Sequence, residues 1–437
     1  MAEWLRSGLQ SRVRRFDSGS RLQAPSPNLF NGEKFLTRLV RRHDLPAWLP
    51  ENRHASLPVM QLPDVMVDAQ LFSQNGDSDP GRLSGILSAP MAEDAFSEIS
   101  GWPEYAPSPI RELPSLAQAA GIGALLYKDE SHRLGIGGAQ ALGGAYSVLR
   151  LSAEILARQI GSRPALSSIR NGAYVDALRR MTVAVASDDP FGLSVAWGAK
   201  LAGCKCRVFV PHSAPSTLVD RIAELDAEPI RIDGDEAAAK RACAVAAVSN
   251  DWHVVTDSPD DSAQPRFQDV LAGYSVIASE ALDVAAGSRP THVFLPARTV
   301  QIAIALAARY QHVLGNRGPR LVLVRSQNEN RPGNGRGIPS VTQDILMQAA
   351  VASVTVDNRF AGPILATLHE RPHGMDGDAF TGILGALGSA ASPALRDLLG
   401  ITKDSCILTL GDLGVARIPN VSDKDLDRTK ISVGKQT

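Results

Sequence analysis

The sequence predicts an α/β protein in which parallel-rich sheets are flanked by helices. After Phe96, short β-branched runs alternate with Ala-rich stretches of helical length, and strands that alternate with helices at this spacing form parallel sheets covered on both faces. The predicted helices include 141–158, 192–202, 215–225 and 237–249. The predicted strands are 125–130, 181–188, 206–211, 229–233, 253–257, 292–297, 320–326, 353–357 and 406–412.

The bulk composition is that of an ordinary globular protein long enough for two or three domains, with 437 residues. Lysines and arginines number 45 against 46 acidic residues, so no global field favours nucleic acid. No apolar run approaches the ~20 residues that span a bilayer. The four cysteines are too few for a disulfide scaffold. We therefore expect free thiols, a reducing compartment and a cytoplasmic location.

Residues 1–95 differ from the rest because they carry scattered arginines, Pro and Ser with little periodicity. This composition predicts an irregular basic leader with one short helix near 33–42. The leader could bind an anionic surface or act as a targeting segment. A solvated arm or a subunit-contacting extension is the simpler interpretation, because charge runs are usually solvated.

The most specific motif runs from Tyr105 to Tyr146 and reads YAPSPIRELPSLAQAAGIGALLYKDESHRLGIGGAQALGGAY. It resembles the fold-type II pyridoxal-phosphate (PLP) enzymes of the tryptophan synthase beta-like group. The closest likeness is to diaminopropionate ammonia-lyase, and the resemblance covers most of the chain from about 97 to 413. It implies a two-domain scaffold and a homodimer. The expected parts are a leader (1–95), a discontinuous large domain (96–144 and 276–425), a small domain (145–275) and a tail (426–437).

Gln140 stands where the resemblance places the family's lysine, which forms an imine with the cofactor aldehyde. An amide nitrogen is not a nucleophile and does not shuttle protons near neutral pH. The next motif, in which an asparagine of the family contacts the cofactor ring, has Pro190 at that position and Asp189 before it. Proline offers neither a side-chain donor nor a backbone N–H.

The family's glycine-rich phosphate turn corresponds to residues 294–303, which contain no glycine. Arg298 and Thr299 lie there, and Arg298 could attract an anion through its side chain instead of a backbone nest. A later turn of the family is kept in part as Thr409 to Asp412. If three anchors contributed about 2 kcal/mol each, their joint loss would weaken binding roughly 10⁴-fold. We therefore expect no cofactor.

One catalytic position of the family is kept, because Asp188 stands where the resemblance places a second base. With Asp189 beside it, this carboxylate could remove a proton from a substrate. The alternative is that Asp188 caps the helix that starts near Phe191. Lys128, with the two acidic residues after it, matches positions that serve structural ion pairing in the family, and His132 with Arg133 is interpreted as an exposed loop pair.

Three functions remain open on these observations. The first is a pseudoenzyme that binds a partner or a small anionic, amino-acid-like ligand through the degenerate pocket of Gln140, Pro190, Arg298, Thr299 and Thr409. The second is a cofactor-independent lyase or hydrolase for a small carboxylate substrate, with Asp188 as base. The third is a PLP-dependent ammonia-lyase. No cluster of His and Cys suggests a metal.

Overall fold

This computed structural model describes residues 66–72, 83, 85–257, 265–284, 289–297, 300–327, 349–357, 359 and 380–411. They fall in one compact unit, Met60–Thr437, whereas the unit Met1–Val59 lies outside the described residues together with the helix expected near 33–42. None of the helices in these ranges is long and apolar enough to cross a membrane.

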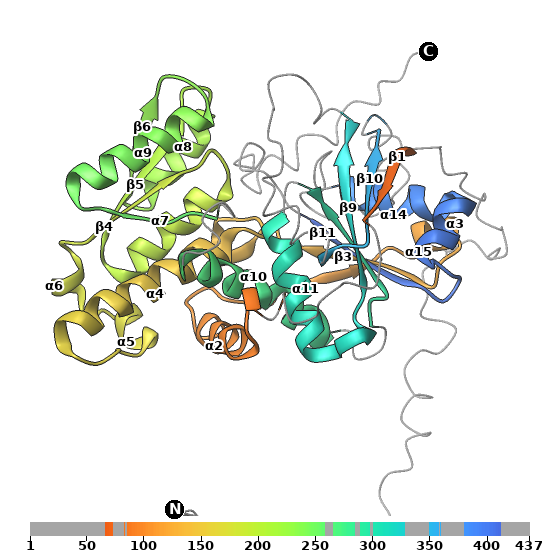
Figure 1. Cartoon of the computed structure of the whole chain (residues 1–437), viewed down its shortest axis with the longest axis horizontal. Coiled ribbons are helices and arrows are strands. Elements are labelled where there is room, and N and C mark those ends of the chain that lie inside the picture. The colour runs from red at the N-terminus through yellow and green to blue at the C-terminus, as the bar shows by residue number, and fades with distance from the viewer. Residues whose placement is uncertain are drawn as a thin grey trace, which may run out of the picture. The chain divides into compact units, whose positions relative to one another are not determined.

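A seven-stranded sheet forms the larger core (Figure 1). Its inner five strands are parallel, and one antiparallel strand closes each edge. The inner strands are apolar on both faces because helices cover both. In spatial order the strands are β1 (Met66–Leu71), β10 (Ala352–Val356), β9 (Arg320–Ser326), β8 (His292–Pro296), β11 (Cys406–Gly411), β3 (Ala124–Asp129) and β2 (Ile110–Glu112).

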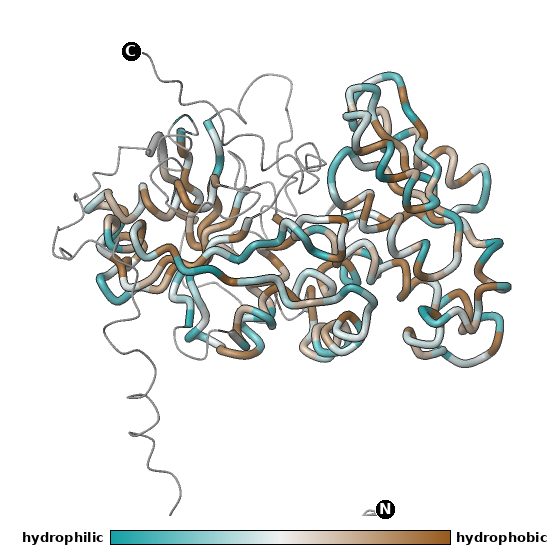
Figure 2. The backbone as a smooth tube through the Cα atoms, turned by 180° about the vertical axis from the view of Figure 1, so that it is seen from behind, coloured by the Kyte–Doolittle hydropathy of each residue, from teal (hydrophilic) through white to brown (hydrophobic). Residues whose placement is uncertain are grey.

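The two faces of this sheet bury different clusters. Val293 and Leu295 of β8 pack with α11 (Val300–Leu314), whereas Phe294 between them packs with α14 (Thr381–Ala391). This alternation is the period of two that a strand imposes on its side chains. Figure 2 shows hydrophobic stretches (brown) along these strands and hydrophilic ones (teal) at loops and outer helix surfaces.

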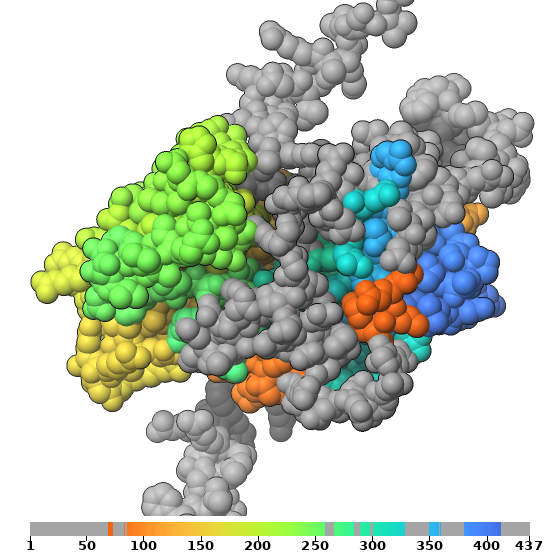
Figure 3. All heavy atoms as spheres, turned by 45° about the horizontal axis from the view of Figure 1, so that its top comes forward, coloured from red at the N-terminus to blue at the C-terminus, as the bar shows by residue number. Residues whose placement is uncertain are grey.

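A second sheet of four strands is wholly parallel. Its order is β6 (Glu228–Ile232), β5 (Lys205–Pro211), β4 (Thr182–Ala186) and β7 (His253–Val254). Helices α8 (Ser216–Glu224) and α9 (Glu236–Asn250) belong to this sheet and lie at the surface, in green tones in Figure 3. The exposed side chains of Val245 and Val248 lie on α9.

The remaining described helices complete the layers. Short 3-10 turns are η1 (Arg133–Gly135) and η4 (Gly315–Arg317). The α-helices are α2 (Ala89–Ile99), α3 (Pro114–Ala120), α4 (Ala141–Ile160), α5 (Leu166–Arg170), α6 (Val175–Leu178), α7 (Pro190–Ala202), α10 (Pro265–Val284) and α15 (Pro393–Leu399).

Helix α4 packs between α7 and α10 through glycines. A Cβ atom at Gly198 of α7 would lie 2.6 Å from the Cα of Ala145, and one at Gly273 of α10 would lie 2.8 Å from the Cα of Gly143. The helix backbones can approach this closely because these positions carry no side chain. The position of α4, whose first turn carries Gln140, is therefore set by backbone contact on two sides.

The predicted fold class is confirmed, and so are all nine predicted strands and the four predicted helices, with ends that differ by a few residues. Strands β1 and β2 were not predicted. Strand β1 lies within the stretch that was interpreted as an irregular leader. Both are edge strands without a continuous apolar run, and β2 has only three residues. The free thiols are confirmed, and burial raises the pKa of Cys406 to about 11. The domain boundaries stay a prediction.

We predict that Gly198→Ala lowers the free energy of unfolding by about 1–3 kcal/mol, because the added methyl group must push α4 and α7 apart. Chemical denaturation measures the change. The control is Gly85→Ala, where a Cβ atom would meet nothing within 4 Å, and where we expect a change within about 0.5 kcal/mol. Equal effects of the two substitutions would contradict the close contact.

Candidate functional site

The site begins in the loop that joins β3 to α4. Four of its residues have positive φ, namely Leu134, Gly135, Gly137 and Gly138. The N–H of Gly138 donates to the carbonyl of Glu130 at 2.9 Å, which closes the loop on itself. Glycine adopts such angles without strain. The loop can therefore turn tightly and deliver Gln140 to the first turn of α4.

A buried cluster of four charges holds this loop. The Nζ of Lys128 lies 2.6 Å from Oε2 of Glu280 on α10. The guanidinium of Arg133 lies 2.8 Å from Glu130 and 2.7 Å from Glu280. All four side chains are almost completely excluded from solvent. Each cation faces a carboxylate, as burial of a charge requires.

Neutral groups complete the cluster. The hydroxyl of Ser108 donates to Glu130 at 2.6 Å, and the hydroxyl of Tyr105 donates to Glu280 at 2.9 Å. Burial favours the protonated form of Glu130, but the charges of Arg133 and Lys128 hold its pKa below the usual range. The structural role expected for Lys128 and Glu130 is confirmed. Arg133 was wrongly interpreted as exposed, because its partner Glu280 is distant in the sequence.

The carboxyl end of β4 holds the second part of the site. The side chain of Asp189 accepts from the N–H of Phe191 at 3.0 Å and from the hydroxyl of Ser187 at 2.6 Å. Asp189 is therefore the N-cap of α7, with Pro190 as the first helical residue. The alternative that Asp188 is the cap is wrong, because the side chain that accepts from the first turn of α7 is that of Asp189.

Gln140 joins this second part to α4. Its amide nitrogen donates to Oδ2 of Asp189 at 3.2 Å, across 49 residues of sequence. The structure therefore brings together Gln140, Asp189 and Pro190, with Asp188 next to them in the chain. Thr409 lies apart inside β11, where its buried hydroxyl donates to the carbonyl of Leu126. Arg298 and Thr299 lie outside the described residues.

Asp257, which follows β7, is a site residue that sequence reasoning missed. Burial, followed by the charge of Asp189, raises the pKa of Asp257 to about 7. The amide of Gln301, in the first turn of α11, donates to the backbone carbonyl of Asp257 at 3.0 Å. The signal in the sequence was its place as the last residue of the predicted strand 253–257. The starts of α4, α7 and α11 are thus linked to strand ends of the four-stranded sheet.

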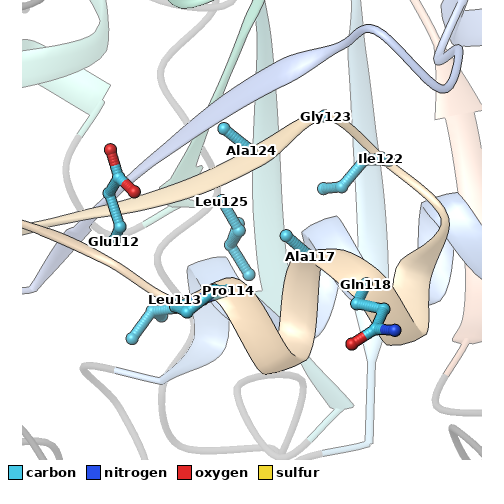
Figure 4. Close-up of a pocket in the computed structure, with 9 residues that line it drawn as sticks. All are labelled: Glu112, Leu113, Pro114, Ala117, Gln118, Ile122, Gly123, Ala124 and Leu125. Carbon is cyan, nitrogen blue, oxygen red and sulfur yellow. The ribbon is translucent and has the colours of Figure 1, made fainter. Parts of the chain in front are cut away.

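A pocket of about 310 Å³ lies elsewhere, between β2, α3 and the start of β3 (Figure 4). Its only charged lining residue is Glu112, and Gln118 adds an amide to the lining. Ligands in parallel α/β sheets bind at the carboxyl ends of the strands, whereas this pocket lies at the opposite end of β3. It is not part of the candidate site.

Comparison with known proteins identifies the family. Residues 102–368, more than half of the chain, match the family model "Pyridoxal-phosphate dependent enzyme". The chain belongs to this family. The matched range includes Gln140, Asp188, Asp189 and Asp257.

Two curated proteins are similar to this chain over part of its length. Diaminopropionate ammonia-lyase of Escherichia coli (strain K12) is 30% identical over 243 residues, which cover 55% of this chain and 58% of that protein. Probable D-serine dehydratase of Rhizobium leguminosarum bv. trifolii is also 30% identical over 243 residues, covering 53% of this chain and 51% of that protein. The chain thus spans little more than half the length of these relatives.

A solved structure confirms the fold. The apo form of Escherichia coli diaminopropionate ammonia-lyase superposes with a TM-score of 0.68, covering 84% of this chain and 95% of that one at 22% identity. The family match confirms the resemblance stated from the sequence for the family, and this superposition confirms it for the fold.

Two predictions from the sequence are wrong in view of these matches. The expectation of a pseudoenzyme or a cofactor-independent enzyme is contradicted by similarity to PLP-dependent lyases, as is the expectation of no cofactor. That reasoning counted single side chains in short motifs. Backbone N–H groups at helix starts can hold a phosphate without any particular side chain, so such a count does not decide cofactor binding. The assignment of Gln140 to the lysine position stays a prediction.

The described residues fit pyridoxal phosphate in part. The phosphate turn expected at residues 294–303 leads into the first turn of α11, and N–H groups at a helix start suit a phosphate dianion. The aldehyde needs an amine for covalent attachment. Within the described ranges, no lysine bonds to Gln140 or Asp189, and Lys128 is held by Glu280. The polar contacts around Gln140 and Asp189 suit non-covalent contacts to a bound cofactor.

We predict that Lys128→Met lowers the free energy of unfolding by about 3–5 kcal/mol, because Glu280 and Glu130 lose a buried partner. Denaturant titration measures the loss. The matched control is Lys200→Met, which breaks an exposed pair with Asp226 at 2.9 Å, and where we expect less than about 1 kcal/mol. A similar loss in both variants would show that the buried cluster contributes no more to the free energy of unfolding than an exposed ion pair does.

Proposed function

We propose that the chain is a PLP-dependent lyase that removes a substituent from the β-carbon of a small amino acid. The observation that carries this proposal is the family match over residues 102–368. The names of two relatives at 30% identity support it, because they describe loss of ammonia from diaminopropionate and loss of water from D-serine. Both substrates are three-carbon amino acids with a polar group on Cβ.

In this proposal the protein side chains position the substrate and move its protons. When bound, pyridoxal phosphate supplies an electron sink for the carbon that loses its proton. When bound, the phosphate would be held by N–H groups at the start of α11, where the resemblance places the phosphate turn. Asp188, at the carboxyl end of β4, accepts the proton from Cα. Gln140 donates to the carboxylate of Asp189 and helps to fix its orientation.

Several expectations from the sequence remain part of the proposal. They are an amino-acid-like ligand, a homodimer, a cytoplasmic location, and anion contacts from Arg298 and Thr299. No contact in the described residues bears on them.

We predict that purified protein binds added pyridoxal phosphate saturably and without a covalent link at position 140, because this side chain is an amide. Visible absorption during titration measures binding. Borohydride followed by peptide mass analysis should find no adduct in the wild type and one adduct at position 140 in Gln140→Lys. Gln118→Lys, at an exposed glutamine on α3, should give none.

Two results would contradict this prediction. Absence of saturable binding would refute the proposed function. A borohydride-stable adduct on a wild-type lysine would refute the non-covalent mode.

We also predict that 2,3-diaminopropionate or serine yields ammonia and a keto acid, and that Asp188→Asn lowers kcat by roughly 100-fold or more because the base for the Cα proton is lost. A coupled keto-acid assay measures the rate. Asp176→Asn changes an exposed carboxylate on α6 and should leave kcat unchanged. An active Asp188→Asn enzyme would remove this residue from the mechanism.

A further inference from the structure

A buried serine of α7 holds the first turn of α4. The hydroxyl of Ser194 donates to the carbonyl of Ala141 at 2.5 Å and accepts from the N–H of Ala145 at 2.9 Å. This carbonyl and this N–H lie four residues apart, so they are the two partners of one backbone hydrogen bond of an α-helix. Ser194 therefore bridges one turn of a helix to which it does not belong, directly after Gln140.

Two other buried serines show the ordinary arrangement. Ser152 of α4 donates to the carbonyl of Val148, and Ser275 of α10 donates to the carbonyl of Ala272, so each bonds within its own helix. A serine inside a helix commonly satisfies its hydroxyl in this way. Ser194 instead donates to a carbonyl 53 residues away in the sequence. Its hydroxyl consequently couples two helices.

The two helices come close enough for this contact because α4 has a glycine there. A Cβ atom at Gly144 would lie 2.8 Å from Cγ2 of Val195 and 3.0 Å from the hydroxyl oxygen of Ser194. Ser194 and Ala145 are completely buried, so bulk solvent does not replace either bond. The position of the hydroxyl is thus set by packing.

The starts of the same two helices are joined a second time at the site. Gln140 donates to Asp189, the N-cap of α7, at 3.2 Å, which is the upper end of the usual range for an N–H···O bond. A small separation of the two helix starts is enough to break such a bond. Because Ser194 holds the backbone of the residue that follows Gln140, it also decides where the amide of Gln140 lies.

We propose that Ser194 is a positioning residue that aligns Gln140 with Asp189, an inference that rests on the proposed function. Since Ser194 is fully buried, it acts through the backbone of α4 and not by contact with a substrate. The alternative is that Ser194 only stabilises the packing of α4 on α7. The two differ in one consequence, because only alignment makes the effect of Ser194 depend on the amide at position 140.

The first test measures the affinity for pyridoxal phosphate by titration of visible absorption. Ser194→Ala should raise Kd by roughly 3- to 10-fold, which is the effect of losing about one hydrogen bond. In the Gln140→Met background the amide is already absent, so the same substitution should leave Kd nearly unchanged.

The matched control is Ser152→Ala, which removes an equally buried hydroxyl from α4 and should change Kd in neither background. An equal rise in Kd on Ser194→Ala in both backgrounds, or no rise in the wild type, would overturn the proposal.

The second test uses the full chain without added cofactor. Chemical denaturation gives the midpoint of unfolding of the wild type, of the two single variants and of the double variant. Ser194→Ala should lower the midpoint less in Gln140→Met than in the wild type, because the bond between Gln140 and Asp189 is then already absent. Ser152→Ala should lower it equally in both. Strictly additive effects of Ser194→Ala and Gln140→Met would leave Ser194 as a packing residue and refute the alignment.

Ser194→Cys covers the case in which the alanine variant does not fold. A thiol has nearly the shape of the hydroxyl but is a weaker donor and acceptor, so its effects should depend on position 140 in the same way, and effects independent of that position would contradict the proposal. The two tests also separate this proposal from the proposed function. If the wild type does not bind pyridoxal phosphate, the proposed function fails, while the midpoints of unfolding still decide whether Ser194 acts through Gln140.

Discussion

The buried ion cluster of Lys128, Glu130, Arg133 and Glu280 is the constraint on which the site depends. Moving one charge out of water costs several kcal/mol unless a partner and further hydrogen bonds replace the solvent. Here the end of β3, the loop before α4 and helix α10 each contribute charges, and none of these segments can be placed without the others. The loop that carries Gln140 is consequently held in one conformation by electrostatics at its base.

The chemistry of the site lies a short distance along the chain from this cluster, where strand ends of the four-stranded sheet meet helix starts. Asp189 serves as a helix cap, as an acceptor for Gln140 and as a neighbouring charge for Asp257. A single carboxylate thus links the local stability of α7 to the protonation of the site. The helix starts supply backbone donors, and the strand ends supply acids.

Much of the fold could be predicted from the sequence, because buried parallel strands are continuous apolar runs between amphipathic helices. Strands β1 and β2 could not, since edge strands need no such run. For the site, local motifs indicated Gln140, Asp188 and Asp189 but not the bond between Gln140 and Asp189, because pairings across long stretches of chain follow from tertiary packing. The burial of Arg133 and the contact of Asp257 with Gln301 escaped for the same reason. The cofactor prediction failed because backbone donors leave no trace in side-chain identity.

The glycine contacts of α4 limit which substitutions this protein can accept during evolution. A methyl group at position 143, 198 or 273 would collide with a neighbouring helix, so a larger residue at any of them requires compensating changes on the opposite helix. These positions must therefore vary together or not at all, whereas the outer faces of α8 and α9 are free to drift. The core around α4 should be the slowest-evolving part of the chain, independently of which substrate the site accepts.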